Sequence, residues 1–249
     1  SEEIPEKLPE ESSKQRKKKA AAGGAAPVKD DDKKKVETGV LLKRRNRAAD
    51  HDYYVFVPET YDAKVSHGVL VWLHPIRRTK EDDVKGMLFW WEEYLEKNNL
   101  ILVAPISGNE DGWSANEADF VREATNSVVS AYNVDKRRIV AHGMGVGGQL
   151  AYYLGFSARD LYRGIAPIAA ALSSKPKSRS STEPVSFYVV AGEKDPIVGG
   201  VKGGVEKLKK AKYSVIYREL KQKAHQYFDA DTEKTLGELA RWIDCLDRI

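Results

Sequence analysis

The chain of 249 residues is long enough for one large domain with a tail, and 41% of its residues are hydrophobic. Its 41 Lys and Arg residues stand against 37 Asp and Glu residues, a formal net charge of only +4. The clustered basic face of a nucleic-acid-binding protein is therefore not expected. No apolar run reaches the roughly 18–20 residues of a membrane helix, and the visible N-terminus has no signal-peptide pattern. We expect a soluble domain of unknown compartment, with no membrane span and no nucleic acid as partner.

The first part of the chain differs in composition from the rest. Residues 1–37 contain no aromatic side chain and carry charged runs such as KQRKKK and DDDKKK. Such a stretch cannot bury enough apolar surface to offset the entropy of ordering it. We predict a disordered charged linker or tail over residues 1–37, which could connect the chain to another domain. A single folded domain is predicted over residues 38–249.

From Val40 onward, apolar runs alternate with helical patterns. Several runs are continuously apolar and end in Gly or Pro, which is typical of strands covered on both faces. The expected strands are Tyr53–Pro58, Val69–Pro75, Leu100–Pro105, Arg138–His142, Ile165–Ala170, Val185–Gly192 and Ser214–Leu220. Helical spacing relates Val84, Met87, Leu88, Trp91 and Leu95, and later Leu236, Leu239, Ile243 and Leu246. The alternation predicts an α/β fold with a mostly parallel, doubly wound sheet.

The single cysteine, Cys245, lies within the last helical pattern. One cysteine excludes internal disulfides and a cluster of thiolate metal ligands. Its apolar neighbours predict a buried thiol.

The segment RIVAHGMGVGGQLAYYLGF, residues 138–156, predicts a strand, a glycine-rich turn and a helix. Gly143, Gly145 and Gly148 satisfy the G-x-G-x-x-G fingerprint of dinucleotide binding. That fingerprint also needs an acidic residue about 20 positions on to hold a ribose. The next predicted strand continues into residues 171–174, ALSS, without an acid. A nucleotide-binding α/β domain is therefore kept as a third hypothesis.

The same turn fits a nucleophile elbow, G-x-S-x-G, in which a strained strand-to-helix turn lifts one side chain above the sheet. Gly143 and Gly147 occupy the small-residue positions, and Gly145 stands in the place of the serine. The chain thus resembles the α/β-hydrolase superfamily, in its esterase, feruloyl-esterase-like and polyhydroxyalkanoate-depolymerase-like branch, from about Tyr53 to the C-terminus. The resemblance implies an α/β-hydrolase fold with helices flanking the central sheet.

The remaining triad residues match the family in chain order, which is nucleophile, acid and histidine. Asp195 follows the predicted strand Val185–Gly192 and resembles the family's acid. His225 follows the next predicted strand, Ser214–Leu220, and stands where the family has its base. Together with position 145, these residues form the candidate catalytic set.

The resemblance also implies an oxyanion hole built from backbone N–H groups. One N–H comes from the residue after the nucleophile position, here Val146, and the other from the loop after the strand Val69–Pro75. Pro75 has no N–H to donate, so Ile76 is the candidate donor. His74 is interpreted as a structural loop histidine.

Trp113 and Ser114 lie in the loop after the strand Leu100–Pro105. Ligands of open α/β sheets bind beyond the carboxyl ends of the strands, so these two residues are expected at a ligand pocket. Trp90 and Trp91 could also line such a pocket, although Trp91 shares the apolar helix face and is expected in the core.

Glycine offers no hydroxyl for attack, so covalent catalysis through Gly145 is excluded. The leading hypothesis is an esterase-like domain with a degenerate triad, catalytically impaired and used for binding or scaffolding. Its ligand would be an acyl ester or another small molecule. The alternative is an active carboxylic-ester hydrolase that uses another nucleophile, such as Ser114, or a water activated by His225 and Asp195. No metal or cofactor is expected.

Overall fold

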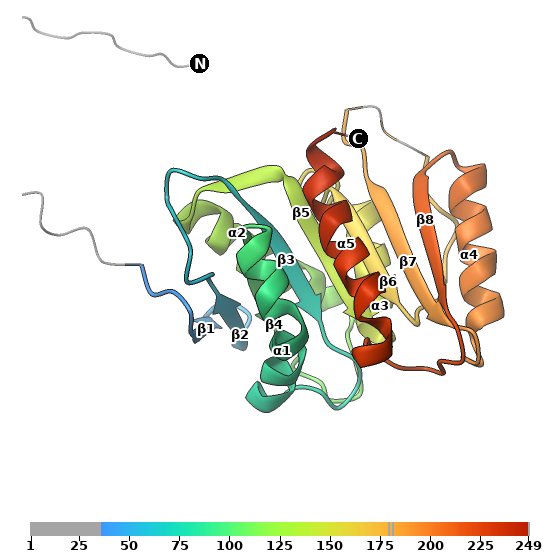
Figure 1. Cartoon of the computed structure of the whole chain (residues 1–249), viewed down its shortest axis with the longest axis horizontal. Helices are drawn as coiled ribbons and strands as arrows, with labels where there is room; N and C mark the ends of the chain where they lie inside the picture. The colour runs from blue at the N-terminus through green and yellow to red at the C-terminus, as the bar shows by residue number, and fades with distance from the viewer. Residues whose placement is uncertain (1–35, 179, 181, 249) are drawn as a thin grey trace, which may run out of the picture. The chain divides into compact units, whose positions relative to one another are not determined.

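A single sheet organises the part of the chain that the computed structural model describes, residues 36–178, 180 and 182–248 (Figure 1). Its strands are β1 (Leu41–Asn46), β2 (His51–Phe56), β3 (His67–Leu73), β4 (Leu100–Pro105), β5 (Val134–Met144), β6 (Gly164–Ile168), β7 (Ser186–Gly192) and β8 (Ser214–Leu220). They lie in the order β1-β2-β4-β3-β5-β6-β7-β8. Neighbours from β4 to β8 are parallel, whereas β2 is antiparallel to both β1 and β4. The predicted tail over residues 1–37 lies almost entirely outside the described residues.

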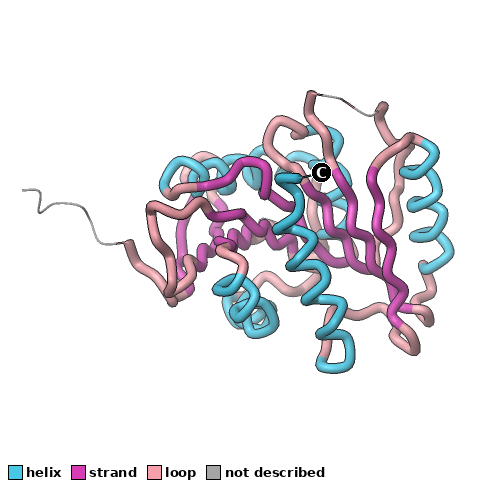
Figure 2. The backbone as a smooth tube through the Cα atoms, turned by 45° about the horizontal axis from the view of Figure 1, so that its top comes forward, coloured by secondary structure: helices cyan, strands magenta, loops and turns pink. Residues whose placement is uncertain are grey.

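Helices cover both faces of the sheet (Figures 1 and 2). They are α1 (Glu81–Lys97), α2 (Ala118–Ala131), α3 (Val146–Ser157), α4 (Val198–Lys210) and α5 (Glu233–Cys245), with short 3-10 helices at Ala115–Glu117, Ala230–Thr232 and Leu246–Arg248. Side chains of α1 and α5 share one buried cluster, and those of α2, α3 and α4 share the other. Alternate residues of strands β2 to β8 enter different clusters, as the pleat requires. Within the described residues, no helix is both long and apolar enough to cross a membrane.

The predicted fold class is confirmed, and each of the seven expected strands is present with bounds moved by a few residues at most of their ends. Strand β1 was not predicted. Its sequence LLKRRN has an exposed, basic middle, because it is an edge strand that pairs with β2 alone. Lys43 and Arg45 reach across to Asp52 on β2 at 2.9 Å and 2.8 Å.

The prediction of a buried Cys245 is wrong. The thiol is exposed because Leu239, Trp242, Ile243 and Leu246 fill the inward face of α5 and its continuation. Cys245 lies on the opposite side of that helix. The predicted inward face itself, Leu236 to Leu246 at helical spacing, is buried as expected.

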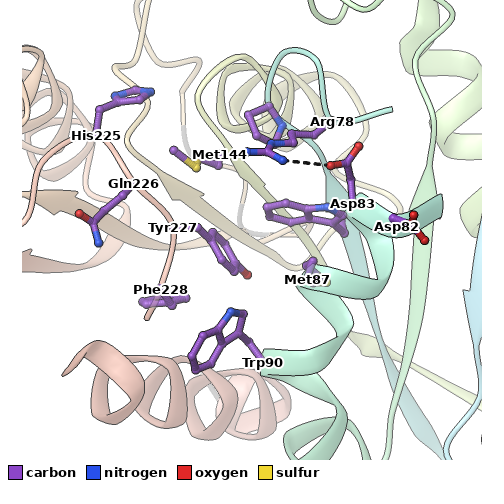
Figure 3. A pocket seen from close by; sticks show the side chains of 13 residues that line it. Arg78, Asp82, Asp83, Met87, Trp90, Met144, His225, Gln226, Tyr227 and Phe228 are labelled. Carbon is purple, nitrogen blue, oxygen red and sulfur yellow. Dashed lines mark hydrogen bonds and ion pairs between the residues drawn. The ribbon is translucent and has the colours of Figure 1, made fainter. Parts of the chain in front are cut away.

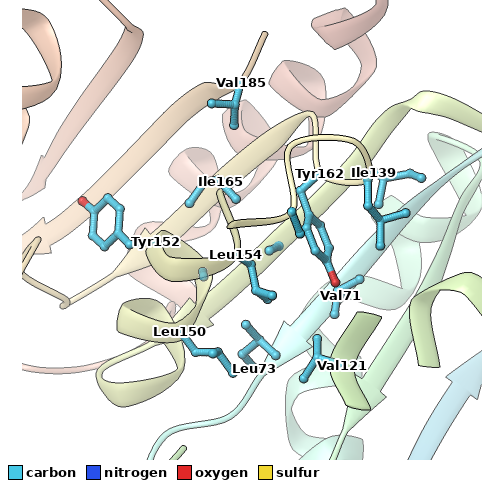
Figure 4. Close-up of a cluster of buried hydrophobic side chains, with 14 of the residues drawn as sticks. Val71, Leu73, Val121, Ile139, Leu150, Tyr152, Leu154, Tyr162, Ile165 and Val185 are labelled. Carbon is cyan, nitrogen blue, oxygen red and sulfur yellow. The ribbon is translucent and has the colours of Figure 1, made fainter. Parts of the chain in front are cut away.

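Helix α3 is held firmly against the sheet. Leu150 and Leu154 on its inner side pack in a buried cluster with Val71 and Leu73 of β3 and with Tyr162 (Figure 4). All of these side chains are at most 5% exposed. The first turn of α3 is thereby fixed above the carboxyl ends of β3 and β5, where ligands of such sheets bind.

Candidate functional site

A sharp turn joins β5 to α3. Gly145 occupies it with φ 57° and ψ −121°, a positive φ that glycine adopts readily and other residues rarely. Its N–H donates to the carbonyl of Ile168 on β6, and its carbonyl accepts the N–H of Gln149, both at 3.0 Å. A Cβ on Gly147 would fall 2.0 Å from the carbonyl oxygen of Leu73. The turn therefore favours glycine at position 145 for its conformation and requires glycine at position 147 for close packing.

An acid and a histidine meet beside this turn. Asp195 lies in the turn after β7, and its side chain is completely buried. One carboxylate oxygen accepts the N–H of Ile197 at 3.0 Å, and the other bonds Nδ1 of His225 at 2.9 Å. His225 comes from the loop after β8 and is 45% exposed. A Cβ built on Gly145 would stand 3.7 Å from Nε2 of His225, so the structure brings the three residues together.

This arrangement fixes what His225 can do. A carboxylate bonded to Nδ1 holds the proton of a neutral imidazole on that nitrogen, which leaves Nε2 as an acceptor. Nε2 lies on the side of Gly145. A hydroxyl or a water between the two residues would therefore meet a proton acceptor.

A small cavity of about 210 Å³ opens at this point. Its lining residues are Pro75, Ile76, Gly145, Val146, Gln149, Ala169, Ile197 and His225. Within the described part of the chain, the N–H groups of Val146 and Ile76 donate to no backbone or side-chain acceptor. The residues that carry these two free donors thus line the same cavity as His225. None of the described lining residues is acidic, so the G-x-G-x-x-G interpretation has no carboxylate here to hold a ribose.

His74 anchors the loop that carries Pro75 and Ile76. Its ring is 1% exposed, and Nδ1 bonds the carbonyl of Pro75 at 2.8 Å. The N–H of Ser107 donates to Nε2 at 3.0 Å, so Nδ1 carries the proton and is the donor to Pro75. Burial lowers the pKa of His74, and the ring remains neutral near pH 7. These contacts support a structural role for this histidine.

A larger cavity of about 460 Å³ lies on the other side of His225. Apolar side chains from β3, β5, α1 and the loop after β8 form much of its wall, and Arg78 with Asp83 forms an ion pair at 3.2 Å (Figure 3). The apolar lining residues are Trp72, Pro75, Met87, Trp90, Met144 and Phe228. Pro75 and His225 border both cavities. A ligand could place a polar group at Gly145, in the small cavity, and an apolar body in the larger cavity.

Trp113 and Ser114 line neither of these two cavities. The indole of Trp113 donates to the carbonyl of His74 at 2.9 Å and packs on the ring of His74. The N–H of Ser114 donates to Glu117 at 2.9 Å. Trp113 therefore braces the loop that carries Pro75 and Ile76, and Ser114 caps the short helix Ala115–Glu117. Of the two neighbouring tryptophans, Trp90 lines the larger cavity.

Sequence reasoning missed the buried polar chain beneath the site. The hydroxyl of Tyr227 accepts the indole N–H of Trp91 at 2.7 Å and lies 2.6 Å from Nε2 of His142. His142 is completely buried, and its Nδ1 bonds the carbonyl of Ala166 at 2.7 Å. Burial lowers the pKa of His142 to about 4, so the ring is neutral and its Nε2 accepts from Tyr227. Tyr227 is two residues after His225. Its hydrogen bonds to His142 of β5 and Trp91 of α1 therefore anchor the loop that carries His225.

We expect Tyr227→Phe to lower the free energy of unfolding by about 2 kcal/mol, because it leaves two buried groups, on Trp91 and His142, without a partner. Urea denaturation monitored by circular dichroism measures the loss. Tyr53→Phe is the matched control. The Tyr53 hydroxyl bonds the exposed Ser127, so its loss should change stability by less than about 0.5 kcal/mol. Equal losses in the two variants would contradict the anchoring role.

No protein-family model matches the chain. In sequence it is 28% identical over 109 residues to the curated protein named "Putative esterase NocK" of Nocardia uniformis subsp. tsuyamanensis, a match covering 39% of this chain and 32% of that protein. It is 25% identical over 161 residues to "Probable feruloyl esterase C" of Aspergillus terreus, covering 62% of this chain and 58% of that protein. The first match thus spans about a third of the length of its curated relative, and the second spans somewhat over half of the length of the other.

Solved structures extend the likeness over most of the chain. An S-formylglutathione hydrolase (FrmB) from Staphylococcus aureus superposes with a TM-score of 0.65 at 11% identity, covering 82% of this chain and 98% of that one. MGS-M1, an α/β hydrolase enzyme from a Medee basin deep-sea metagenome library, gives 0.67 at 13% identity, covering 84% and 98%. The chain therefore has the α/β-hydrolase fold. In sequence it is similar to proteins named as esterases.

Proposed function

We propose that this chain is an esterase-like domain whose catalytic triad is degenerate, and that it binds a ligand instead of turning it over. One observation carries the proposal: Nε2 of His225, oriented by Asp195, faces Gly145, which has no side chain. In a serine hydrolase, the base removes a proton from a hydroxyl that then attacks the substrate. Gly145 has no atom that could attack.

The size of the expected impairment follows from how triads work. Loss of the nucleophile from such a unit lowers turnover by on the order of 10⁶-fold. Glycine also removes strain, because a positive φ at this turn costs another residue about 1–3 kcal/mol. A domain that no longer needs the nucleophile would gain stability from glycine at position 145.

The second candidate is an ester hydrolase that uses a water activated by His225. It is favoured by the position of Nε2, which opens onto the small cavity with no protein hydroxyl beside it. Ser114 supports this candidate less well as a nucleophile, since its hydroxyl lies 3.4 Å from Glu117 and outside the two cavities at His225.

Hydrolysis of p-nitrophenyl butyrate separates the two candidates. We expect the wild-type chain to turn over at the buffer rate and His225→Ala, prepared at matched purity, to give the same rate. Such a result follows if no group attacks the ester. Turnover by the wild type that His225→Ala abolishes would contradict a binding function and support the activated water.

A further inference from the structure

The site has room for an oxygen atom that the protein does not supply. In an acyl-enzyme, the acyl carbon carries two oxygens, one contributed by the nucleophile and one held by the oxyanion-hole N–H groups. Here the second position has two candidate donors, the unpaired N–H groups of Val146 and Ile76, which both line the small cavity. The first position has only the imidazole of His225 beside it. A ligand that fills both positions must bring both oxygens on one carbon. A free carboxylate has this shape, and an ester has one of its two oxygens blocked by an alkyl group.

We propose, on the basis of the binding function above, that the ligand of this site is a free carboxylate with an apolar body. One carboxylate oxygen accepts the N–H groups of Val146 and Ile76. The other lies over Gly145 and bonds Nε2 of His225. The position over Gly145 is open, because the nearest atoms to a Cβ there are Nε2 of His225 at 3.7 Å and Cβ of Pro75 at 4.0 Å.

In the bound state, a proton must lie between Nε2 of His225 and the carboxylate of the ligand for the two to form a hydrogen bond. Nδ1 of His225 donates to the carboxylate of Asp195 at 2.9 Å, so Nε2 must also be protonated to donate to a ligand carboxylate. The imidazolium then lies between two carboxylates, each in a charge-assisted hydrogen bond. The other charged groups lining the cavities at His225 are Arg78, Asp82 and Asp83, and Arg78 is already paired with Asp83. The bound pair thus holds one proton more than a neutral imidazole and a free carboxylate together.

The larger cavity determines the rest of the ligand. It adjoins the Gly145 position through Pro75 and His225 and is walled by Met87, Trp90 and Met144 (Figure 3). These side chains suit an alkyl or aryl body. Affinity should rise by about fourfold for each methylene added from acetate to butyrate, because each buried methylene contributes about 0.8 kcal/mol.

Isothermal titration calorimetry of the full chain with 3-phenylpropanoate tests the proposal at pH 7. The carboxylate should bind at least about tenfold more tightly than methyl 3-phenylpropanoate, the advantage of a charge-assisted hydrogen bond. Gly145→Ser should weaken binding by at least about tenfold, because its hydroxyl takes the place of the ligand oxygen. Gly199→Ser is the matched control and should bind as the wild type does, since a Cβ there has no neighbour within 4 Å.

Three results would overturn the carboxylate assignment. They are no binding of 3-phenylpropanoate, equal affinity for its methyl ester, and undiminished binding by Gly145→Ser. The proposed function fails separately: ester turnover by the wild type contradicts it whether or not the carboxylate binds. An inactive wild type that binds no carboxylate overturns this inference alone.

Discussion

Gly145→Ser should raise the hydrolysis of p-nitrophenyl butyrate by about 10³-fold over the wild-type chain. A serine Cβ fits, since it would lie 3.7 Å from Nε2 of His225 and 4.0 Å from Cβ of Pro75. From there, its hydroxyl can reach Nε2, and Asp195 already orients the ring. We expect less than the full 10⁶-fold of an intact triad, because Pro75 has no N–H and Ile76, which must donate in its place, is 48% exposed.

Two further variants separate true catalysis from other effects of the new hydroxyl. Gly145→Ser combined with His225→Ala should lose the gain, because no base then activates the hydroxyl. Gly199→Ser, on the exposed side of α4, should have wild-type activity. A fluorophosphonate reagent should add to Gly145→Ser at position 145, as intact-mass and peptide mass spectrometry would show. A folded Gly145→Ser chain with no activity and no adduct would contradict the degenerate-triad interpretation.

Gly147→Ala should lower the free energy of unfolding by about 4 kcal/mol or more, beyond the 1–3 kcal/mol typical of overpacking. A Cβ there would fall 2.0 Å from the carbonyl oxygen of Leu73, 2.6 Å from its carbonyl carbon and 2.8 Å from the carbonyl oxygen of His74. All three atoms belong to the backbone at the end of β3, which is buried in the sheet and cannot yield as a side chain can. Urea denaturation measures the loss, and failure to fold is its extreme form.

Gly203→Ala provides the contrast for this prediction. A Cβ on Gly203 has no neighbour within 4 Å, and the residue lies inside α4, where alanine is favoured over glycine by about 0.5–1 kcal/mol. This variant should therefore be slightly more stable than the wild type. If Gly147→Ala unfolded at the urea concentration of the wild type, the close approach of α3 to β3 described above would be wrong.

The buried strands were predictable because their chemistry is local. A parallel strand covered on both faces must be apolar throughout, and Leu100–Pro105 satisfies this with six buried residues. Strand β1 forms only because β2 lies beside it, and its polar sequence contains no sign of that pairing. Cys245 was misplaced for a related reason, since a helix in an apolar stretch still has an outer face.

For the candidate site, the order of residues along the chain predicted the acid and the histidine, but the contacts between distant residues could not be predicted from the sequence. Asp195 and His225 each follow a strand in the order that the α/β-hydrolase resemblance implies, and the structure joins them at 2.9 Å. Nothing in the sequence indicates that Tyr227 and His142, 85 positions apart, share a hydrogen bond. The same holds for Met144, which lines the larger cavity together with Met87 and Trp90 of α1. Their roles arise only when distant segments meet.

The open sheet has a consequence for how this protein behaves at high concentration. Within the described residues, its two outermost strands, β1 and β8, each pair with one neighbour, so that a strand from another molecule could add on the other side. On β1, an added strand would lie against the charged side chains of Lys43, Arg44 and Arg45, two of which pair with Asp52. On β8, Arg218 is exposed and Glu219 is drawn into ion pairs with lysines. The basic residues of β1, which are the reason that this strand was not predicted from the sequence, thus oppose edge-to-edge aggregation.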